Sequence, residues 1–221
     1  MTRSGSAPTP VLYLHGFASS PQSTKARYFA ERLAAHGVAL AAPDFNQPDF
    51  TSLTMSRMLD QLDAEIDAVG GRATLMGSSL GAALAVLAAG RFADAVDRLV
   101  LLAPAVMFAK PGHSLLPPER IEEWRHRGSL PFFHYAYGEE RALQYEFYAD
   151  SLQHDAFEVA FTQPTLIFQG LGDTVVDPRT VELFARTRPN VTLSLLDDDH
   201  QLAASLPRMW ASVEDFLGLL D

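Results

Sequence analysis

The chain contains no cysteine. Disulfide bonds, thiolate zinc sites and cysteine nucleophiles are therefore excluded. Basic residues are also few, since 17 lysines and arginines stand against 27 aspartates and glutamates, and the formal net charge is −10. Because an excess of negative charge disfavours contact with a phosphate backbone, we expect no nucleic-acid partner.

Long apolar runs are missing as well. No stretch of the sequence approaches the roughly 20 apolar residues that a membrane-spanning helix needs. Residues 1–8 hold one arginine but no apolar segment of the kind found in a secretory signal. We therefore expect a cytoplasmic protein without a membrane span.

The remaining composition is that of a folded globular protein, with 48% hydrophobic and 20% charged residues in a chain of 221. At roughly 100–200 residues per domain, this length predicts a single domain over residues 1–221. A domain of this size can bury a sizeable core without disulfides or metals.

Short apolar runs alternate with helical patterns along most of the chain. The predicted strands cover 11–14, 38–42, 73–76, 98–102, 165–168 and 191–196, and the predicted helices cover 24–36, 53–69, 80–91, 178–186 and about 202–219. This alternation predicts an α/β protein with a mostly parallel sheet that is covered by helices on both faces. Right-handed crossovers make it a three-layer α/β/α sandwich.

The alternation is interrupted over residues 104–163, a stretch rich in proline, aromatic residues and histidine. It is too long for a plain loop, so we expect helices within it. We interpret it as a cap inserted above the sheet rather than as an independent domain.

The sharpest motif is Gly77-Ser78-Ser79-Leu80-Gly81, a G-x-S-x-G sequence. It follows a predicted strand directly and opens a predicted helix, which is the context that a nucleophile elbow requires. The tight turn needs small residues on both sides, and it raises the central serine at the carboxyl end of the sheet. Ser79 is therefore the candidate nucleophile, although a glycine-flanked turn without chemistry would show the same pattern.

A serine hydroxyl is a weak nucleophile and needs a base, which in turn needs an acid to orient it. His200 follows the last predicted strand, so it should lie at the same sheet edge as Ser79. Asp173 follows the fifth predicted strand and is our candidate for the acid. Its rival, Asp177, precedes Pro178 and is better explained as a helix N-cap.

The other titratable residues are weaker candidates. His36 ends a predicted helix and should be solvated, and His15 ends the first strand, where we favour a structural role over base chemistry. The adjacent carboxylates at 197–199 lack further spaced ligands, so we predict no metal. The histidines in the cap either touch substrate or face water: His113, His126, His134 and His154.

An acyl-transfer site also needs two backbone donors for the oxyanion. One should be the amide of Leu80, which follows the nucleophile. The other should come from the turn at His15, Gly16 and Phe17, where the Phe17 amide would point into the site.

Aromatic rings crowd into the cap, and they either form a small satellite core or roof a pocket above Ser79. An insertion after the fourth strand emerges at the carboxyl edge of the sheet, where such sites open. In the second case the cap and Phe17 would set the size of the acyl or alcohol group. The candidate pocket residues are His15, Trp124, Phe132, Phe133 and Tyr135.

These motifs, in this order, resemble the α/β-hydrolase superfamily from Val11 to Leu219, without the first two antiparallel strands of its larger members. More narrowly, the chain is similar to the small bacterial YqiA-like esterases, from whose smallest members its long aromatic cap differs. That similarity is carried by G-S-S-L-G and by the segment Leu12-Tyr13-Leu14-His15-Gly16-Phe17-Ala18-Ser19-Ser20-Pro21, followed by Ser23 and Lys25-Ala26. The resemblance implies hydrolysis of carboxylic esters with short acyl chains and no cofactor.

We therefore expect a serine esterase that acts on a small-molecule ester through Ser79, His200 and Asp173. Because one fold hosts many chemistries, a thioesterase, a peptidase, a carbon–carbon bond hydrolase or a cofactor-free perhydrolase remains open. A non-catalytic binding protein on the same scaffold is the third possibility. The oligomeric state is left open by the sequence.

Overall fold

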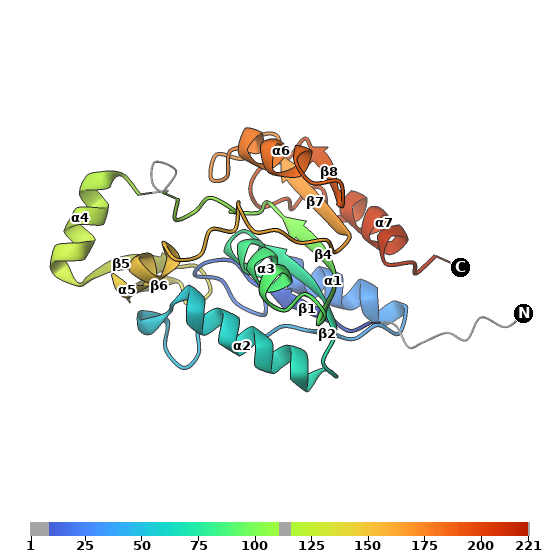
Figure 1. Ribbon diagram of the computed structural model, residues 1–221, viewed down its shortest axis with the longest axis horizontal. Helices are drawn as coiled ribbons and strands as arrows, with labels where there is room; N and C mark the ends of the chain where they lie inside the picture. The colour runs from blue at the N-terminus through green and yellow to red at the C-terminus, as the bar shows by residue number, and fades with distance from the viewer. Residues whose placement is uncertain (1–8, 111–115, 221) are drawn as a thin grey trace, which may run out of the picture.

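The computed structural model describes residues 9–110 and 116–220. Its centre is a six-stranded sheet in the order β2-β1-β3-β4-β7-β8, and every neighbouring pair is parallel (Figure 1). The strands are β1 (Val11–Leu14), β2 (Leu40–Ala41), β3 (Ala73–Ser78), β4 (Val96–Leu102), β7 (Thr165–Gly170) and β8 (Val191–Leu196).

Helices cover both faces of this sheet. One face packs against α1 (Thr24–Ala35) and α7 (Leu206–Phe216), and the other packs against α2 (Met55–Ala68), α3 (Leu80–Arg91) and α6 (Pro178–Arg186). Alternate residues of a strand point to opposite faces, so Val11 and Tyr13 enter one core while Leu12 and Leu14 enter the other. The predicted three-layer α/β/α sandwich is confirmed.

Two predicted elements are shorter in the structure. β2 pairs with β1 only at Leu40 and Ala41, and the following Pro43 has no N–H to extend the ladder. The last helix begins at Leu206 rather than near 202, because Leu202 adopts a positive φ of 55°. Helix α7 also carries a proline in its first turn, where proline is favoured.

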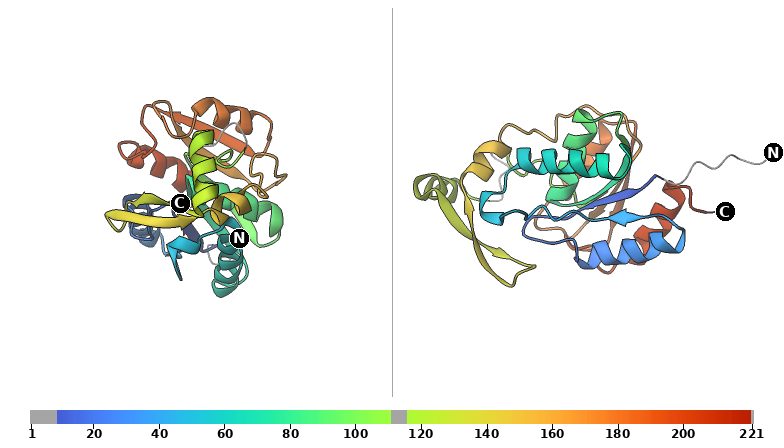
Figure 2. Two further views of the ribbon diagram at one scale, coloured as in Figure 1. Left: turned by 90° about the vertical axis from the view of Figure 1, so that its left-hand side faces the viewer. Right: turned by 90° about the horizontal axis from the view of Figure 1, so that it is seen from below.

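The insertion between β4 and β7 lies beyond the carboxyl end of the sheet, at the opposite end of the molecule from α7 (Figures 1 and 2). Its elements are α4 (Pro118–Arg127), β5 (Ser129–His134), β6 (Glu139–Gln144) and α5 (Glu146–Ser151). β5 and β6 form an antiparallel hairpin, which we call the cap hairpin. The sequence predicted the helices but not this hairpin, because Pro131 argues against a strand. In a two-stranded sheet both strands are edges, and proline is tolerated there.

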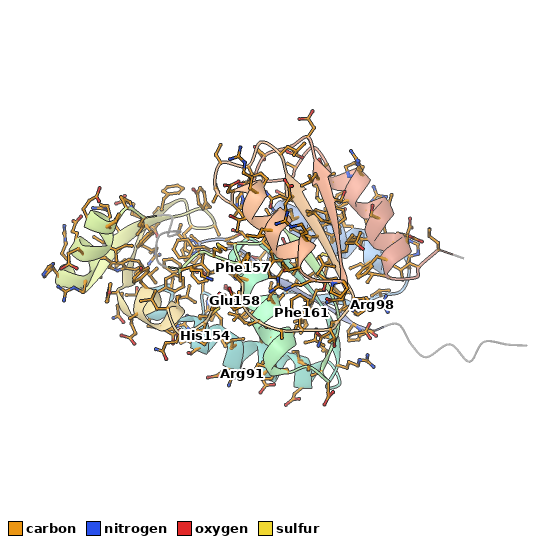
Figure 3. The ribbon with its side chains drawn as sticks, turned by 45° about the horizontal axis from the view of Figure 1, so that its top comes forward. Arg91, Arg98, His154, Phe157, Glu158 and Phe161 are labelled. Atoms are coloured by element: carbon orange, nitrogen blue, oxygen red, sulfur yellow. The ribbon has the colours of Figure 1, made fainter. Side chains whose placement is uncertain are left out.

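The chain returns from the cap to β7 along α3. Figure 3 shows His154, Phe157 and Phe161 along this path. Gln163 anchors its end, since Nε2 donates to the carbonyl oxygens of Ala89 and Ala93 at 3.1 and 2.9 Å. Among the described residues, none of the helices is both long and apolar enough to span a membrane.

Candidate active site

Ser79 sits at a strained turn between β3 and α3. Its φ is 53° and its ψ is −113°, a conformation that costs a non-glycine residue about 1–3 kcal/mol. The turn is so tight that a Cβ at Gly77 would lie 2.4 Å from the carbonyl oxygen of Gly81. A Cβ at Gly81 would lie 2.1 Å from the carbonyl oxygen of Leu14. Both flanking positions therefore require glycine.

The structure brings Ser79, His200 and Asp173 together. Nε2 of His200 lies 3.1 Å from Oγ of Ser79, and Nδ1 of the same ring lies 2.8 Å from Oδ2 of Asp173. The three residues follow β3, β8 and β7, whose carboxyl ends share one edge of the sheet. With Nδ1 donating to the carboxylate, the lone pair of Nε2 is directed at the serine hydroxyl.

The carboxylate of Asp173 is enclosed, and its side chain has no solvent exposure. Oδ1 accepts hydrogen bonds from the amides of Val175 and Val176, both at 2.8 Å, and Oδ2 accepts one from Nε2 of Gln169 at 2.9 Å. Burial by itself raises the pKa of Asp173, but the hydrogen bonds from His200, the two amides and Gln169 outweigh it and lower the pKa. The group is thus held ionised.

Asp177 has a different role. Its side chain accepts a hydrogen bond from the amide of Arg179 at 2.9 Å and caps the N-terminus of α6. The prediction that this residue is an N-cap is confirmed, and it is Asp173 that contacts His200.

A lysine of α1 forms a hydrogen bond with the loop that carries His200. Nζ of Lys25 donates to the carbonyl oxygen of Gln201 at 2.9 Å. Burial lowers the pKa of this lysine, while nearby carboxylates, Asp199 first among them, raise it. No role at the site was predicted for Lys25, and its only signal in the sequence was its place in the opening segment that resembles the YqiA-like esterases.

The aspartates of this loop accept backbone hydrogen bonds. The carboxylate of Asp198 accepts from the amide of Ser205, and that of Asp199 accepts from the amide of Gln201, both at 2.8 Å. In the part of the chain that the structure describes, no three histidine or acidic side chains are grouped so that they could hold a metal ion.

The turn after β1 lies beside the nucleophile. A Cβ at Gly16 would be 3.5 Å from Cβ of Ser79. Leu14, the last residue of β1, pairs with Gly77, the residue before the end of β3, and this register places the turn after β1 next to Ser79. Leu80 is the first residue of α3, and an amide at this position has no acceptor within its own helix.

His15 is buried beneath this turn and is hydrogen-bonded at both ring nitrogens. Nδ1 donates to the carbonyl oxygen of Gly16 at 2.9 Å, and Nε2 accepts from the amide of Phe45 at 3.1 Å. These contacts fit the expected structural role for His15, and they turn both nitrogens toward the protein backbone rather than toward a pocket.

The candidate pocket rings of the cap divide into two groups. Phe132 contacts Phe17 edge to face at 5.6 Å and Trp124 at 5.0 Å. Trp124 is buried and donates from Nε1 to a carbonyl oxygen of β6. Phe133 and Tyr135 are 50% and 76% exposed, and because alternate strand residues face opposite ways, Phe133 points away from Phe132. The structure does not bring Phe133 and Tyr135 to Phe17.

The histidines outside the Ser79 site are held in different ways. His36 is exposed, as expected, and its Nε2 lies 2.9 Å from a carboxylate oxygen of Glu214 in α7. His134 is buried, His154 lies 3.0 Å from the hydroxyl of Ser56, His126 is exposed, and His113 lies outside the described residues.

The fold matches solved structures of hydrolases. Est1E from Butyrivibrio proteoclasticus with ferulic acid bound aligns with a TM-score of 0.82 at 22% identity, over 98% of this chain and 91% of that chain. A putative hydrolase from Agrobacterium vitis S4 aligns at 0.83 and 23%, over 95% and 88%. A monoacylglycerol lipase from Paleococcus ferrophilus aligns at 0.76 and 16%, over 95% of each chain.

At these identities the likeness establishes the fold, and it confirms the predicted resemblance to the α/β hydrolases. No curated protein matches the sequence. The family model that does match covers residues 10–217 and is described as the uncharacterised protein family UPF0227. This chain is a member of the UPF0227 family, and it has the α/β-hydrolase fold.

Proposed function

We propose that the protein is a serine hydrolase that cleaves carboxylic esters. The observation that carries this proposal is the continuous hydrogen-bonded chain from Oγ of Ser79 through the imidazole of His200 to the carboxylate of Asp173. A nucleophile, a base within hydrogen-bond reach and a third group that orients the base are the parts that covalent acyl transfer requires. The strained conformation of Ser79 supports the same role, because such strain concentrates at functional sites.

The proposed reaction has two stages. Oγ of Ser79 attacks the ester carbonyl while Nε2 of His200 takes its proton, and the amides of Phe17 and Leu80 stabilise the resulting oxyanion. The carbon–oxygen bond to the alcohol then breaks, and His200 returns the proton to the leaving alcohol. In the second stage His200 takes a proton from water, the hydroxide attacks the acyl-enzyme, and Ser79 recovers its proton as the acid leaves. Asp173 stabilises the imidazolium in both stages.

Small or short-acyl esters are the proposed substrates. The ring of Phe17 is surrounded by the rings of Phe50, Phe132 and Phe147, each 5.6 Å away between centroids. Apolar rings that pack this closely limit the room beside the proposed oxyanion site, and they suit an apolar group rather than a charged one. We also propose that residues 104–163 act as a cap of this single domain, since Phe132 and Phe147 belong to that segment and Phe17 and Phe50 contact it.

The test is a panel of p-nitrophenyl esters from acetate to palmitate, measured beside a matched thioester and a peptide amide. We expect the highest kcat/KM with the shorter esters. A fluorophosphonate probe should label the folded protein at Ser79, as shown by mass spectrometry of the labelled peptide. A folded protein that is not labelled and cleaves none of these substrates would instead be a binding protein on a hydrolase scaffold.

A further inference from the structure

A buried asparagine joins three segments around the proposed oxyanion site. Asn46 follows β2 and is 3% exposed. Its Nδ2 donates to the carbonyl oxygen of Ser19 and to Oδ1 of Asp44, both at 2.8 Å. Its Oδ1 lies 3.1 Å from Nε2 of His134, the last residue of β5. The loop after β1, the loop after β2 and the cap hairpin therefore meet at one side chain.

The directions of these hydrogen bonds follow from the partners. Because Nδ2 of Asn46 faces two oxygen acceptors, its Oδ1 must be the acceptor toward His134, and Nε2 of His134 carries the proton. Nδ1 of His134 is then the unprotonated nitrogen, and it is buried without a hydrogen-bond partner within the described residues. The ring is held in place by stacking on Tyr137, with centroids 3.9 Å apart, and by an edge contact with Phe50 at 4.7 Å.

The loop that Asn46 holds is the one that carries the Phe17 amide. Ser19 closes this turn by donating from its amide to the carbonyl oxygen of Gly16 at 3.2 Å. Between them, Ala18 is buried and has a positive φ of 52°, which a non-glycine residue keeps only when its surroundings hold it there. The amide of Ala136 in the hairpin turn also approaches the carbonyl oxygen of Ala18, at 3.4 Å.

The cap hairpin packs directly against the segment that follows β2. Strand β6 packs against the short 3-10 helix η1 (Phe50–Ser52), and Figure 2 shows the hairpin beside the segment that contains it. From this geometry, and resting on the function proposed above, we infer that Asn46 is a positioning residue. It fastens residues 16–19 to the cap hairpin at His134 and so keeps the Phe17 amide in the position that the oxyanion needs.

A residue that positions the Phe17 amide should affect the stability of the transition state more than that of the bound substrate. An oxyanion donor acts only where negative charge develops, and its loss costs about a hundredfold to a thousandfold in kcat. A donor that is displaced rather than deleted should lose part of that benefit. Ground-state binding of the ester depends little on the donor, so KM should change much less than kcat.

The isosteric substitution Asn46→Asp tests this most directly. The carboxylate keeps the shape of the side chain but cannot donate to Ser19, and it places negative charge against Asp44. A second variant, His134→Phe, removes only the hydrogen bond to Asn46 and keeps the ring that stacks on Tyr137. If Asn46→Asp does not fold, His134→Phe decides the question.

The matched control is Asn190→Asp. Nδ2 of Asn190 donates to the carbonyl oxygen of Gln163 at 2.8 Å, and the residue precedes β8 at the amino end of the sheet, opposite the Ser79 edge. This variant loses a comparable amide hydrogen bond and should keep the wild-type kcat. The melting temperature of Asn190→Asp measures how much an asparagine-to-aspartate substitution lowers stability in general.

Active sites are first titrated with the fluorophosphonate, so that kcat is expressed per folded site. We expect Asn46→Asp to lower kcat by about tenfold or more, and His134→Phe to lower it by a smaller factor. The affinity of each for an aryl trifluoromethyl ketone, which forms an oxyanion on the serine, should fall in parallel with kcat. KM should change by less than about threefold.

The inference is overturned if both variants keep a kcat within about twofold of Asn190→Asp while only their melting temperatures fall, because the hydrogen bonds would then serve stability alone. Failure of the proposed function gives a different result. In that case the wild-type protein itself would react with neither the ester panel nor the fluorophosphonate.

Discussion

Ser79 and His200 are 121 positions apart in the chain, yet Oγ of one lies 3.1 Å from Nε2 of the other. The parallel sheet produces this contact, because the loops after β3 and β8 emerge at the same edge. Both loops are constrained. Gly77 and Gly81 allow the close backbone packing of the Ser79 turn, and Lys25 donates a hydrogen bond to the His200 loop.

The first prediction concerns the proposed nucleophile. Ser79→Ala should lower kcat by about a thousandfold or more, since the covalent route is lost while binding and the oxyanion donors remain. Circular dichroism should show an intact fold. Ser78→Ala is the control and should keep most of the activity, because Nε2 of His200 is hydrogen-bonded to Ser79, while the Ser78 side chain interacts with Tyr13. Near-normal turnover by folded Ser79→Ala would contradict the mechanism.

The second prediction separates the two aspartates. Asp173→Asn should reduce kcat strongly, since an amide at this position can no longer act as the anionic acceptor for Nδ1–H of His200. Asp177→Ala should leave kcat nearly unchanged and cost about 0.5–2 kcal/mol of stability through the lost N-cap of α6. Steady-state kinetics and urea unfolding of both variants provide the comparison, and exchanged results would identify Asp177 as the acid.

The third prediction uses neighbouring rings on opposite faces of the cap hairpin. Phe132→Ala should change kcat/KM unequally across the ester series, because Phe132 contacts Phe17. A difference of one methylene in a pocket is worth about 1–3 kcal/mol. Phe133→Ala removes an exposed ring and should leave the ester profile as it is. If Phe132→Ala lowers the melting temperature and changes kcat/KM by the same factor for every ester, the ring belongs to a satellite core.

The fourth prediction follows from the burial of His134. Burial is the main cause that lowers the pKa of this imidazole, electrostatic interactions with His15 and Arg141 lower it further, and Asp44 opposes them. The unfolded chain, with a histidine pKa of about 6.5, then binds a proton that the folded protein excludes. The free energy of unfolding should therefore fall as the pH drops below about 6.5.

His134→Phe should weaken this dependence, because phenylalanine binds no proton in either state. The measurement is the free energy of unfolding by urea between neutral and mildly acidic pH, for the wild type and the variant. Parallel curves across this range would show that His134 does not contribute to the acid sensitivity.

The fifth prediction concerns Lys25. Lys25→Met keeps much of the apolar length of the side chain but loses the hydrogen bond from Nζ to the carbonyl oxygen of Gln201. Because Gln201 adjoins His200, kcat should fall while KM changes little. Lys25→Arg, which can still donate a hydrogen bond, should retain more activity than Lys25→Met. Equal activity of wild type and Lys25→Met would show that this lysine contributes only to stability.

Local patterns in the sequence determined the main elements. The continuous apolar runs of β1, β3 and β7 predict buried parallel strands, and the runs lie where those strands are found. Asp177 followed by Pro178 marks the start of α6, because both residues act on backbone groups within one turn. The Ser79 turn was predictable for the same reason, since its glycines and its serine lie within five consecutive positions.

Only the tertiary structure decided which distant groups meet. The hairpin of β5 and β6 depends on pairing between strands, which lets Pro131 occupy an edge that local propensity disfavours. Lys25 and Asn46 carry no local signal of their contacts, because their partners lie at Gln201 and His134. Hydrogen bonds between loops depend on where the sheet and the cap place those loops, so residue type and short-range spacing could not predict them.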